Sequence, residues 1–264
     1  MQLFKYVEPA RVDVLINETI AFTPPERFKD PFEFRPIVAP GSRVRLKQNL
    51  KDAAKQEFKE SPDFYKKFSR KERREKERKA VNEALRQVRS GEAGHSEKIQ
   101  DSIVNEASKS IGILCLCSKQ DENLMWYHYA DGHRGFVMEF HTQHEDFLKL
   151  GKPTEVIYSD TPAILDLDKP NNDLSRIKPM YLKYEAEYRI IAPLPVSTPH
   201  KTPDGLPLYL AKLPRTCIKA VYLGHRMEKA WREKLLKAIS SASIAKFEVV
   251  PNRNDFKFSY REIK

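Results

Sequence analysis

The sequence has 264 residues, of which 40% are hydrophobic and 32% are charged, so it can bury a core, and a chain that is disordered throughout is excluded. No stretch approaches the roughly 20 apolar residues of a membrane-spanning helix, and three cysteines without a paired framework, together with a first segment that lacks an apolar leader, predict a reduced, cytoplasmic protein. The 47 Lys and Arg exceed the 37 Asp and Glu by ten, which favours phosphate-rich partners.

The first part of the chain is predicted to be rich in strands. Apolar runs at residues 3–7 (LFKYV) and 19–23 (TIAFT) flank a helix or turn at 9–18. Pro and Asp then cluster at 23–32 (TPPERFKDPF), as they do in ordered loops with many rigid backbone positions.

From about Leu50 the pattern becomes helical. A long helix is expected within residues 63–90, where eleven Lys and Arg accompany five acidic residues, and another is expected at 97–109. We therefore predict that residues 1–264 form a single domain, and that 50–110 are a helical insertion that projects from it.

The second half alternates between strands and helices. The unbroken apolar run IGILCLC (111–117) is typical of a central strand, and a short helix at 121–131 leads to a strand at 135–140. Further strands are expected at 155–159, 187–193, 217–224, 246–250 and 255–260, with an amphipathic helix at 227–242. The predicted fold class is α+β, with a mixed, mainly antiparallel sheet core and a basic helical insertion.

Residues 184–191 (YEAEYRII) combine strand-forming side chains with three charges. In a continuous strand, Glu185, Glu187 and Arg189 share one face, because side chains alternate. One interpretation is a half-buried strand whose charged face pairs with neighbours in water. The other is a ligand site.

Residues 124–140 (LMWYHYADGHRGFVMEF) gather aromatic rings with imidazole, phenol and carboxylate groups. One interpretation is that these side chains belong to the core. The other is that Trp126, His128, Tyr129 and Asp131 bind a planar ligand. No metal site is expected, because Cys and His lack the paired spacing of zinc sites. The common phosphate-loop, dinucleotide, zinc-protease and hydrolase signatures are also absent from the sequence.

The basic helix has two interpretations of its own. Its interleaved acidic residues favour a solvated, ion-paired helix, whereas its excess of cations would also suit a nucleic-acid backbone. The candidate phosphate contacts are Lys66, Lys67, Arg70, Arg73, Arg74 and Arg78.

Four stretches, at 4–7, 17–34, 114–140 and 181–190, resemble the bacterial domain-of-unknown-function family 2971. That family typically shows an asparagine-aspartate-proline-phenylalanine signature, a tryptophan-x-histidine-tyrosine-alanine signature and a paired-glutamate strand. Asp30, Pro31 and Phe32 match the first signature, while Lys29 stands where asparagine is usual. Members are often found near phage-defence and mobile elements, so the resemblance implies a bacterial effector tied to defence or stress.

The stretch EAEYRIIAP (185–193) is also similar to the third signature of ADP-ribosyltransferases, which binds and activates NAD. This resemblance implies NAD as cofactor and an architecture like that of those enzymes. Glu187 would stabilise a ribose oxocarbenium, Glu185 would orient the acceptor or act as base, and Arg189 would compensate one of the two charges. Tyr6 and Thr23 are further catalytic candidates, and the ligand-binding candidates from the first strand and the 23–34 loop are Lys5, Phe28, Asp30, Phe32 and Phe34.

Three hypotheses for the function follow. The first is a cytoplasmic effector that acts as an NAD-dependent ADP-ribosyltransferase-like enzyme. The second is a nucleic-acid-binding or nuclease-like protein that uses the 65–90 helix, His128 and Asp131. The third is a non-catalytic module whose charged helix contacts a partner protein. Binding of NAD, compared with binding of RNA and DNA, discriminates between them.

Overall fold

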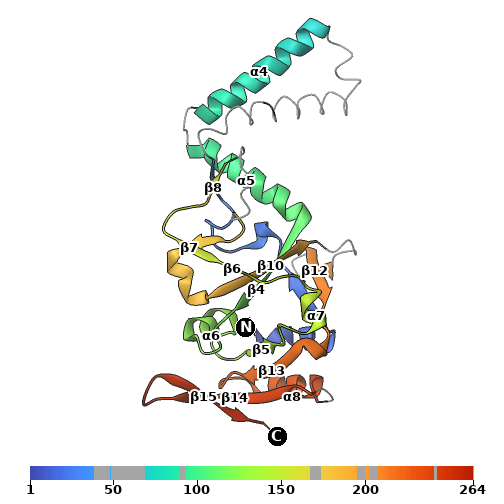
Figure 1. Ribbon diagram of the computed structural model, residues 1–264, viewed down its shortest axis with the longest axis vertical. Coiled ribbons are helices and arrows are strands. Elements are labelled where there is room, and N and C mark those ends of the chain that lie inside the picture. Colours follow the sequence, from blue (N-terminus) through green and yellow to red (C-terminus); the bar gives the residue numbers. More distant parts are fainter. Residues whose placement is uncertain are drawn as a thin grey trace.

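The computed structural model describes residues 1–38, 48, 69–89, 93–166, 174–194, 200–201, 207–240 and 243–263. It has an α+β fold built on an eight-stranded mixed sheet, mainly antiparallel (Figure 1), which confirms the predicted fold class. Lys66, Lys67 and the start of the predicted basic helix lie outside the described residues.

The large sheet carries the core of the molecule. Its one parallel pair among the described strands is β13 with β14, connected through helix α8 (Lys229–Ala238), as a parallel pair requires a crossover. In spatial order the strands are β15 (Lys257–Glu262), β14 (Ala245–Asn252), β13 (Ile218–Leu223), β5 (Phe136–Phe140), β1 (Phe4–Val7), β4 (Ile111–Cys117), β10 (Glu187–Pro193) and β6 (Thr154–Glu155).

Smaller pairings surround this sheet. The strand β12 (Pro207–Lys212) pairs with both β2 (Thr19–Phe22) and β11 (His200–Lys201). Two parallel pairs form from β7 (Ile157–Ser159) with β9 (Ile177–Pro179), and from β3 (Ile37–Val38) with β8 (Ile164–Leu165). The short helices are η1 (Pro9–Val12), α1 (Asp13–Ile16), η2 (Pro25–Arg27), α6 (Asn123–Tyr129), α7 (Glu145–Leu148), η4 (Met180–Glu185) and η5 (Arg215–Cys217).

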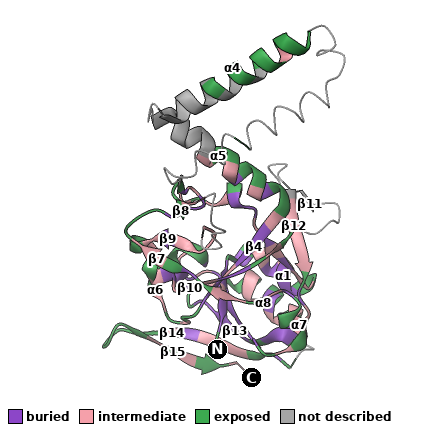
Figure 2. Ribbon diagram, turned by 45° about the horizontal axis from the view of Figure 1, so that its top comes forward, coloured by how far each residue is buried: buried purple, intermediate pink, exposed green. Residues whose placement is uncertain are grey.

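Strand alternation gives the large sheet two apolar faces. Val7 of β1 and Leu3, just before the strand, join one buried cluster, which α8 covers with Leu235. Phe4 and Tyr6 of β1 join a second cluster with Trp126 of α6. Figure 2 shows buried residues concentrated along the central strands. Because β1 is buried on both faces, its position also determines where the loops at its two ends begin.

The helical insertion contains α4 (Arg70–Arg89) and α5 (Ala93–Ser110). Figure 1 shows α4 extending away from the sheet, but the second half of α5 does not project as we expected. Val104 and Ser108 are buried there, and Val104 packs with Phe34 and Ile113. The Ser108 hydroxyl also accepts a hydrogen bond from the backbone N–H of Glu26 at 2.8 Å, so α5 covers one end of the sheet.

Candidate functional site

The segment YEAEYRII is not a continuous strand. Glu185 ends η4, Ala186 adopts a left-handed conformation with φ of 42°, and β10 begins only at Glu187. The predicted alternation of the two glutamates along one strand is therefore wrong. Glu185, Glu187 and Arg189 are 4%, 3% and 0% exposed, so the hypothesis of a water-facing charged strand is also wrong.

A second cation and a third glutamate complete a buried charge cluster, formed by Glu33, Lys178, Glu185, Glu187 and Arg189. The ammonium nitrogen of Lys178 lies 2.8 Å from Glu187 Oε2 and 3.2 Å from Glu33 Oε1, and it also contacts Glu185. Arg189 donates from Nε to Glu187 Oε1 at 2.8 Å and from its terminal nitrogens to Glu33 and to the Ser175 carbonyl. Three carboxylates thus meet two cations.

The cluster holds Glu187 in its charged form. Burial alone would raise the pKa of this carboxyl, but Arg189 and Lys178 hold the pKa at about 2. For Glu33, burial outweighs the same two cations and raises the pKa. The pKa values of Lys178 and Arg189 are raised despite their burial, because of the surrounding carboxylates. Both cations and Glu187 are therefore charged at neutral pH.

Aromatic side chains enclose the buried charge cluster. The Tyr129 hydroxyl donates to Glu185 Oε1 at 2.7 Å, and the Tyr158 hydroxyl accepts from the backbone N–H of Glu187 at 2.8 Å. The guanidinium carbon of Arg189 lies 5.2 Å from the ring centre of Phe28 and 5.5 Å from that of Phe34, within cation–π range. Rings and hydroxyls thus add to the ion pairs that fix these charges in place.

A cavity of about 550 Å³, which we call the inner cavity, opens onto Glu33, Glu185 and Glu187, and its size is typical of a small-molecule site. The structure brings most of the predicted site residues to its wall. These are Lys5, Tyr6, Thr23, Phe28, Asp30, His128, Tyr129, Glu185 and Glu187.

Two of these side chains donate hydrogen bonds to backbone carbonyls. The Lys5 ammonium donates to the Cys115 carbonyl at 2.9 Å, and the Tyr6 hydroxyl donates to the Lys119 carbonyl at 2.9 Å. Burial raises the pKa of Tyr6, so its phenol stays protonated. Tyr6 therefore lines the inner cavity with its hydroxyl bound to the backbone. Our prediction of a catalytic role for Tyr6 finds no support in these contacts.

Other predicted residues lie elsewhere. Trp126 is fully buried, stacks on His133 with ring centres 5.4 Å apart and donates from Nε1 to the Gln120 carbonyl at 3.3 Å. It therefore belongs to the core. Asp131 is exposed at a turn, pairs with Arg134 at 3.3 Å, and does not line the inner cavity. Arg189 lies behind Glu187 and does not reach the cavity surface.

Phe32 lines a second, larger cavity of about 1100 Å³, which we call the outer cavity. The two cavities share Pro31 and Lys178 as wall residues. The Tyr181 hydroxyl, from the outer wall, donates to Asp30 Oδ2, from the inner wall, at 2.7 Å. Asp30 Oδ1 also accepts from the backbone N–H of Phe32 at 2.8 Å, which explains the Asp-Pro-Phe sequence as a side-chain-stabilised turn.

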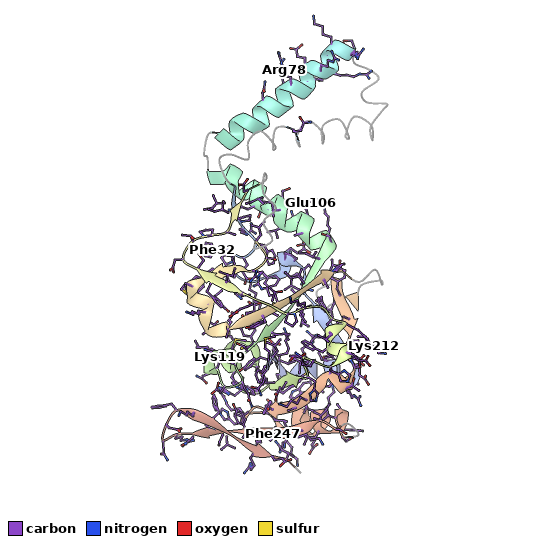
Figure 3. The ribbon with its side chains drawn as sticks, viewed as in Figure 1. Phe32, Arg78, Glu106, Lys119, Lys212 and Phe247 are labelled. Atoms are coloured by element: carbon purple, nitrogen blue, oxygen red, sulfur yellow. The ribbon has the colours of Figure 1, made fainter. Side chains whose placement is uncertain are left out.

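Of the predicted phosphate contacts, Arg70, Arg74 and Arg78 are exposed on α4 and Arg73 is half-buried. Their spacing of four residues places Arg70, Arg74 and Arg78 on one helix face. Figure 3 shows Arg78 on α4, away from the sheet.

Sequence reasoning missed Glu33, Lys178, Tyr158 and Cys115. Lys178 comes from β9, which pairs with β7 and places it beside Tyr158 in register. Cys115 faces Arg189 across the β4–β10 ladder, and burial, with Glu187 as the next cause, raises the pKa of its thiol. The one available signal was Glu33 itself, an acidic residue inside the Asp-Pro-Phe-Glu-Phe stretch.

Among the described residues, no group of three or more His, Cys, Asp and Glu side chains is arranged to hold a metal ion. Within the same residues, no helix has the length and apolar character needed to cross a membrane.

Comparison of the chain with protein-family models, with curated proteins and with solved structures finds no match in any of the three. The two resemblances described above therefore rest on their sequence motifs alone.

Proposed function

We propose that the protein is an NAD-dependent ADP-ribosyltransferase-like enzyme whose active site is the inner cavity. The observation that carries this proposal is the buried charge cluster, where three carboxyl groups on the cavity wall, among them the ionised Glu187, meet two cations. Such fixed charge, held away from water, stabilises a positive charge that develops in the cavity.

Cleavage of the bond between ribose C1′ and nicotinamide develops that kind of charge. The C1′–N bond breaks, nicotinamide leaves as a neutral base with the bonding electron pair, and the ribose becomes an oxocarbenium cation. Glu187 is ionised and fixed by Arg189 and Lys178, so it is in place before the reaction. A nucleophile then attacks C1′ and gives up its proton.

The remaining walls of the inner cavity suit the other parts of NAD. Lys5, Arg27 and Lys29 supply positive charge for a pyrophosphate. The half-buried ring of Tyr184 lies 6.1 Å from the ring of His128, and both line the cavity, so they supply surfaces for a planar base. Cationic, aromatic and acidic groups thus line one cavity.

The central test is the substitution Glu187→Gln. It keeps the side-chain shape and hydrogen-bonding capacity, so the protein should still fold, with a lower melting temperature because the folded state favours ionised Glu187. Nicotinamide release from NAD should fall by roughly 10²–10³-fold, as when one preorganised electrostatic group is removed. Release is measured by chromatography, with the melting temperature recorded for each variant.

Two further variants sharpen this test. Glu262→Gln removes an exposed carboxylate of β15 and should match the parent. Glu185→Gln should impair transfer to an acceptor more than hydrolysis of NAD, because Glu185 shares its charge with the Tyr129 hydroxyl and acts on the incoming nucleophile. A parent protein that releases no nicotinamide, even with cell extract as a source of acceptors, would refute the proposal.

The cellular setting that we propose, a bacterial cytoplasmic effector tied to defence or stress, rests on the motif resemblance. The nuclease-like alternative relied on His128 and Asp131 together, but only His128 lines the inner cavity. Nucleic-acid binding by α4 is supported by the excess of Lys and Arg in that helix. It bears on the identity of the molecule that accepts the ADP-ribose.

A further inference from the structure

The two cavities meet at one boundary. Pro31 and Lys178 line both of them, and the hydrogen bond from Tyr181 to Asp30 joins the outer wall to the inner wall. A transferase needs a second subsite next to the bond that it breaks, so that the acceptor can reach C1′. The outer cavity has that position relative to the buried charge cluster.

The outer cavity exposes aromatic rings at its wall. Phe32 and Tyr181 are each 61% exposed, although both rings are large and apolar. Exposed aromatic side chains beside a cavity offer stacking surfaces for unpaired nucleobases. Ser159, Asp160 and Thr161 add polar groups to the same wall, which suit the hydrogen-bonding edge of a base.

Helix α5 connects this cavity to the basic helix α4. Gln100 and Asp101 of α5 line the outer cavity, and α5 follows α4 directly in the chain. Figure 3 shows Phe32 in the part of the body nearest to α5, with α4 beyond it. A long ligand leaving the outer cavity on this side therefore meets α4.

The charge on α4 is complementary to phosphate. The helix carries nine Lys and Arg against four Glu, a net charge of +5. Arg70, Arg74 and Arg78 lie on one face with Lys71 beside them, and all four are exposed. No ion pair among the described side chains involves these four residues, so their charge is available to a polyanion.

We propose that the outer cavity is the acceptor subsite of the proposed transferase, and that the acceptor is a single-stranded nucleic acid. An unpaired base stacks on Phe32 and Tyr181, and the phosphates that follow run along α4. This inference rests on the proposed function for its chemistry, but its binding step can be tested without NAD.

The transfer step exchanges one bond at C1′ for another. A nitrogen or oxygen of the base attacks C1′ and forms the new bond, while the bond from C1′ to nicotinamide breaks and nicotinamide leaves with the electron pair. The proton lost by the attacking atom passes to Glu185, whose carboxylate lines the inner cavity and contacts Lys178, a residue that lines both cavities. Neither an oxidant nor a metal is required.

The first experiment measures binding of labelled single-stranded DNA and RNA of about 20 nucleotides by fluorescence anisotropy, without NAD. Replacing Arg70, Arg74 and Arg78 together by Gln should weaken binding and lower the slope of log Kd against log salt by about 2, since each phosphate contact on a single strand contributes about 0.7. A matched control replaces the exposed Lys229, Lys237 and Arg253, at the other end of the molecule, by Gln. An equal effect of both triple variants would overturn the proposal.

The second experiment tests the aromatic subsite. Phe32→Leu keeps an apolar side chain but removes the stacking ring, so single-strand affinity should fall about tenfold or more while the salt slope stays unchanged. Double-stranded DNA of the same sequence should bind more weakly than the single strand, because its bases are already stacked. Tighter binding of the duplex, or unchanged affinity in Phe32→Leu, would overturn the assignment.

The two proposals fail in different ways. NAD cleavage without single-strand binding would overturn the acceptor and leave the enzyme. Single-strand binding without NAD cleavage would overturn the enzyme and leave a nucleic-acid site in the outer cavity. Incubation of the parent with labelled NAD and the oligonucleotide should label the nucleic acid, and label found on protein alone would overturn the nucleic-acid acceptor.

Discussion

Arg189 is fully buried, yet its charge is stable because its nitrogens meet Glu187, Glu33 and the Ser175 carbonyl. Removing one partner from such a cluster generally costs about 3–5 kcal/mol, because a charge is left buried without compensation. Glu187 follows the same rule, because the two cations that lower its pKa make the folded state favour its ionised form. Charge and stability are thus coupled at that position.

His133 is a second buried titratable residue, remote from the inner cavity. It lies between Trp126 and His225, with ring centres 5.4 Å and 4.7 Å away, and its Nε2 is 2.9 Å from the Asn123 side-chain oxygen. Burial, followed by His225 and Arg226, lowers the pKa of His133 from 6.5 to about 4. The folded protein therefore favours the neutral ring.

This lowered pKa predicts how stability depends on pH. Between pH 6.5 and 4 the unfolded chain binds a proton that folded His133 does not, so stability is full above pH 6.5 and falls as the pH drops toward 4. The loss should be on the order of 1 kcal/mol after allowance for partial solvent screening. Urea unfolding at several pH values measures it.

The variant His133→Asn tests the assignment, because asparagine tolerates the positive φ of 68° at this position. Its stability should change less than that of the parent between pH 6.5 and 4.5, whatever its absolute value. Protonation of Glu187 lowers stability in a more acidic range, from pH 4.5 down to about 2. The contributions of His133 and Glu187 to the pH dependence of stability can therefore be separated.

At the scale of elements, the junction of η4 with β10 determines the geometry of the two glutamates. Ala186 is the C-cap of η4 and has left-handed backbone angles of 42° and 50°. This turn aims Glu185 toward Tyr129 while Glu187 starts the strand. For an L-residue other than glycine, such a conformation costs about 1–2 kcal/mol.

Ala186→Gly should therefore stabilise the protein by about 0.5–1 kcal/mol, since relief of the left-handed strain exceeds the entropic cost of glycine. Ala186→Val should destabilise it, because a β-branched side chain fits this region poorly. Chemical denaturation of both variants gives the two values. A less stable Gly variant would show that Ala186 carries no strain.

The elements predicted best from the sequence were those whose burial leaves a periodic pattern. The apolar run of β4 and the amphipathic stripe of α8, with Leu235 and Ile239 buried, follow directly from side-chain alternation and helical repeat. The turn at Ala186 has no such signal, because alanine is not a residue that marks left-handed positions. Lys178 and Glu33 were missed for another reason, since only tertiary pairing brings them to Glu187.

At the scale of the whole molecule, the helical insertion divides into two parts. Helix α4 extends from the body (Figure 1), whereas α5 covers Phe34 and Ile113 through Val104. Phe34 in turn contacts Arg189, so α5 supports the candidate site from behind. The two helices should therefore respond differently to deletion.

Replacing residues 41–91 by a short Gly/Ser linker should leave a folded protein that keeps NAD cleavage and loses single-strand affinity. Replacing 41–109 should also remove Val104 and expose Phe34 and Ile113, with a large fall in melting temperature or aggregation. Circular dichroism melts of the two proteins provide the measurement. Equal stability of both deletions would mean that α5 contributes nothing to the core.

The position of β1 in the middle of the large sheet has a consequence for synthesis. Phe4 pairs with Cys117 on one side and with Glu139 on the other, so both partners leave the ribosome more than a hundred residues after it. At about 5–20 residues per second, the segment LFKYV waits on the order of ten seconds with its apolar side chains unpaired. The nascent chain is therefore most open to chaperone capture and aggregation during that interval, and β1 is paired on both sides only once β5 has emerged.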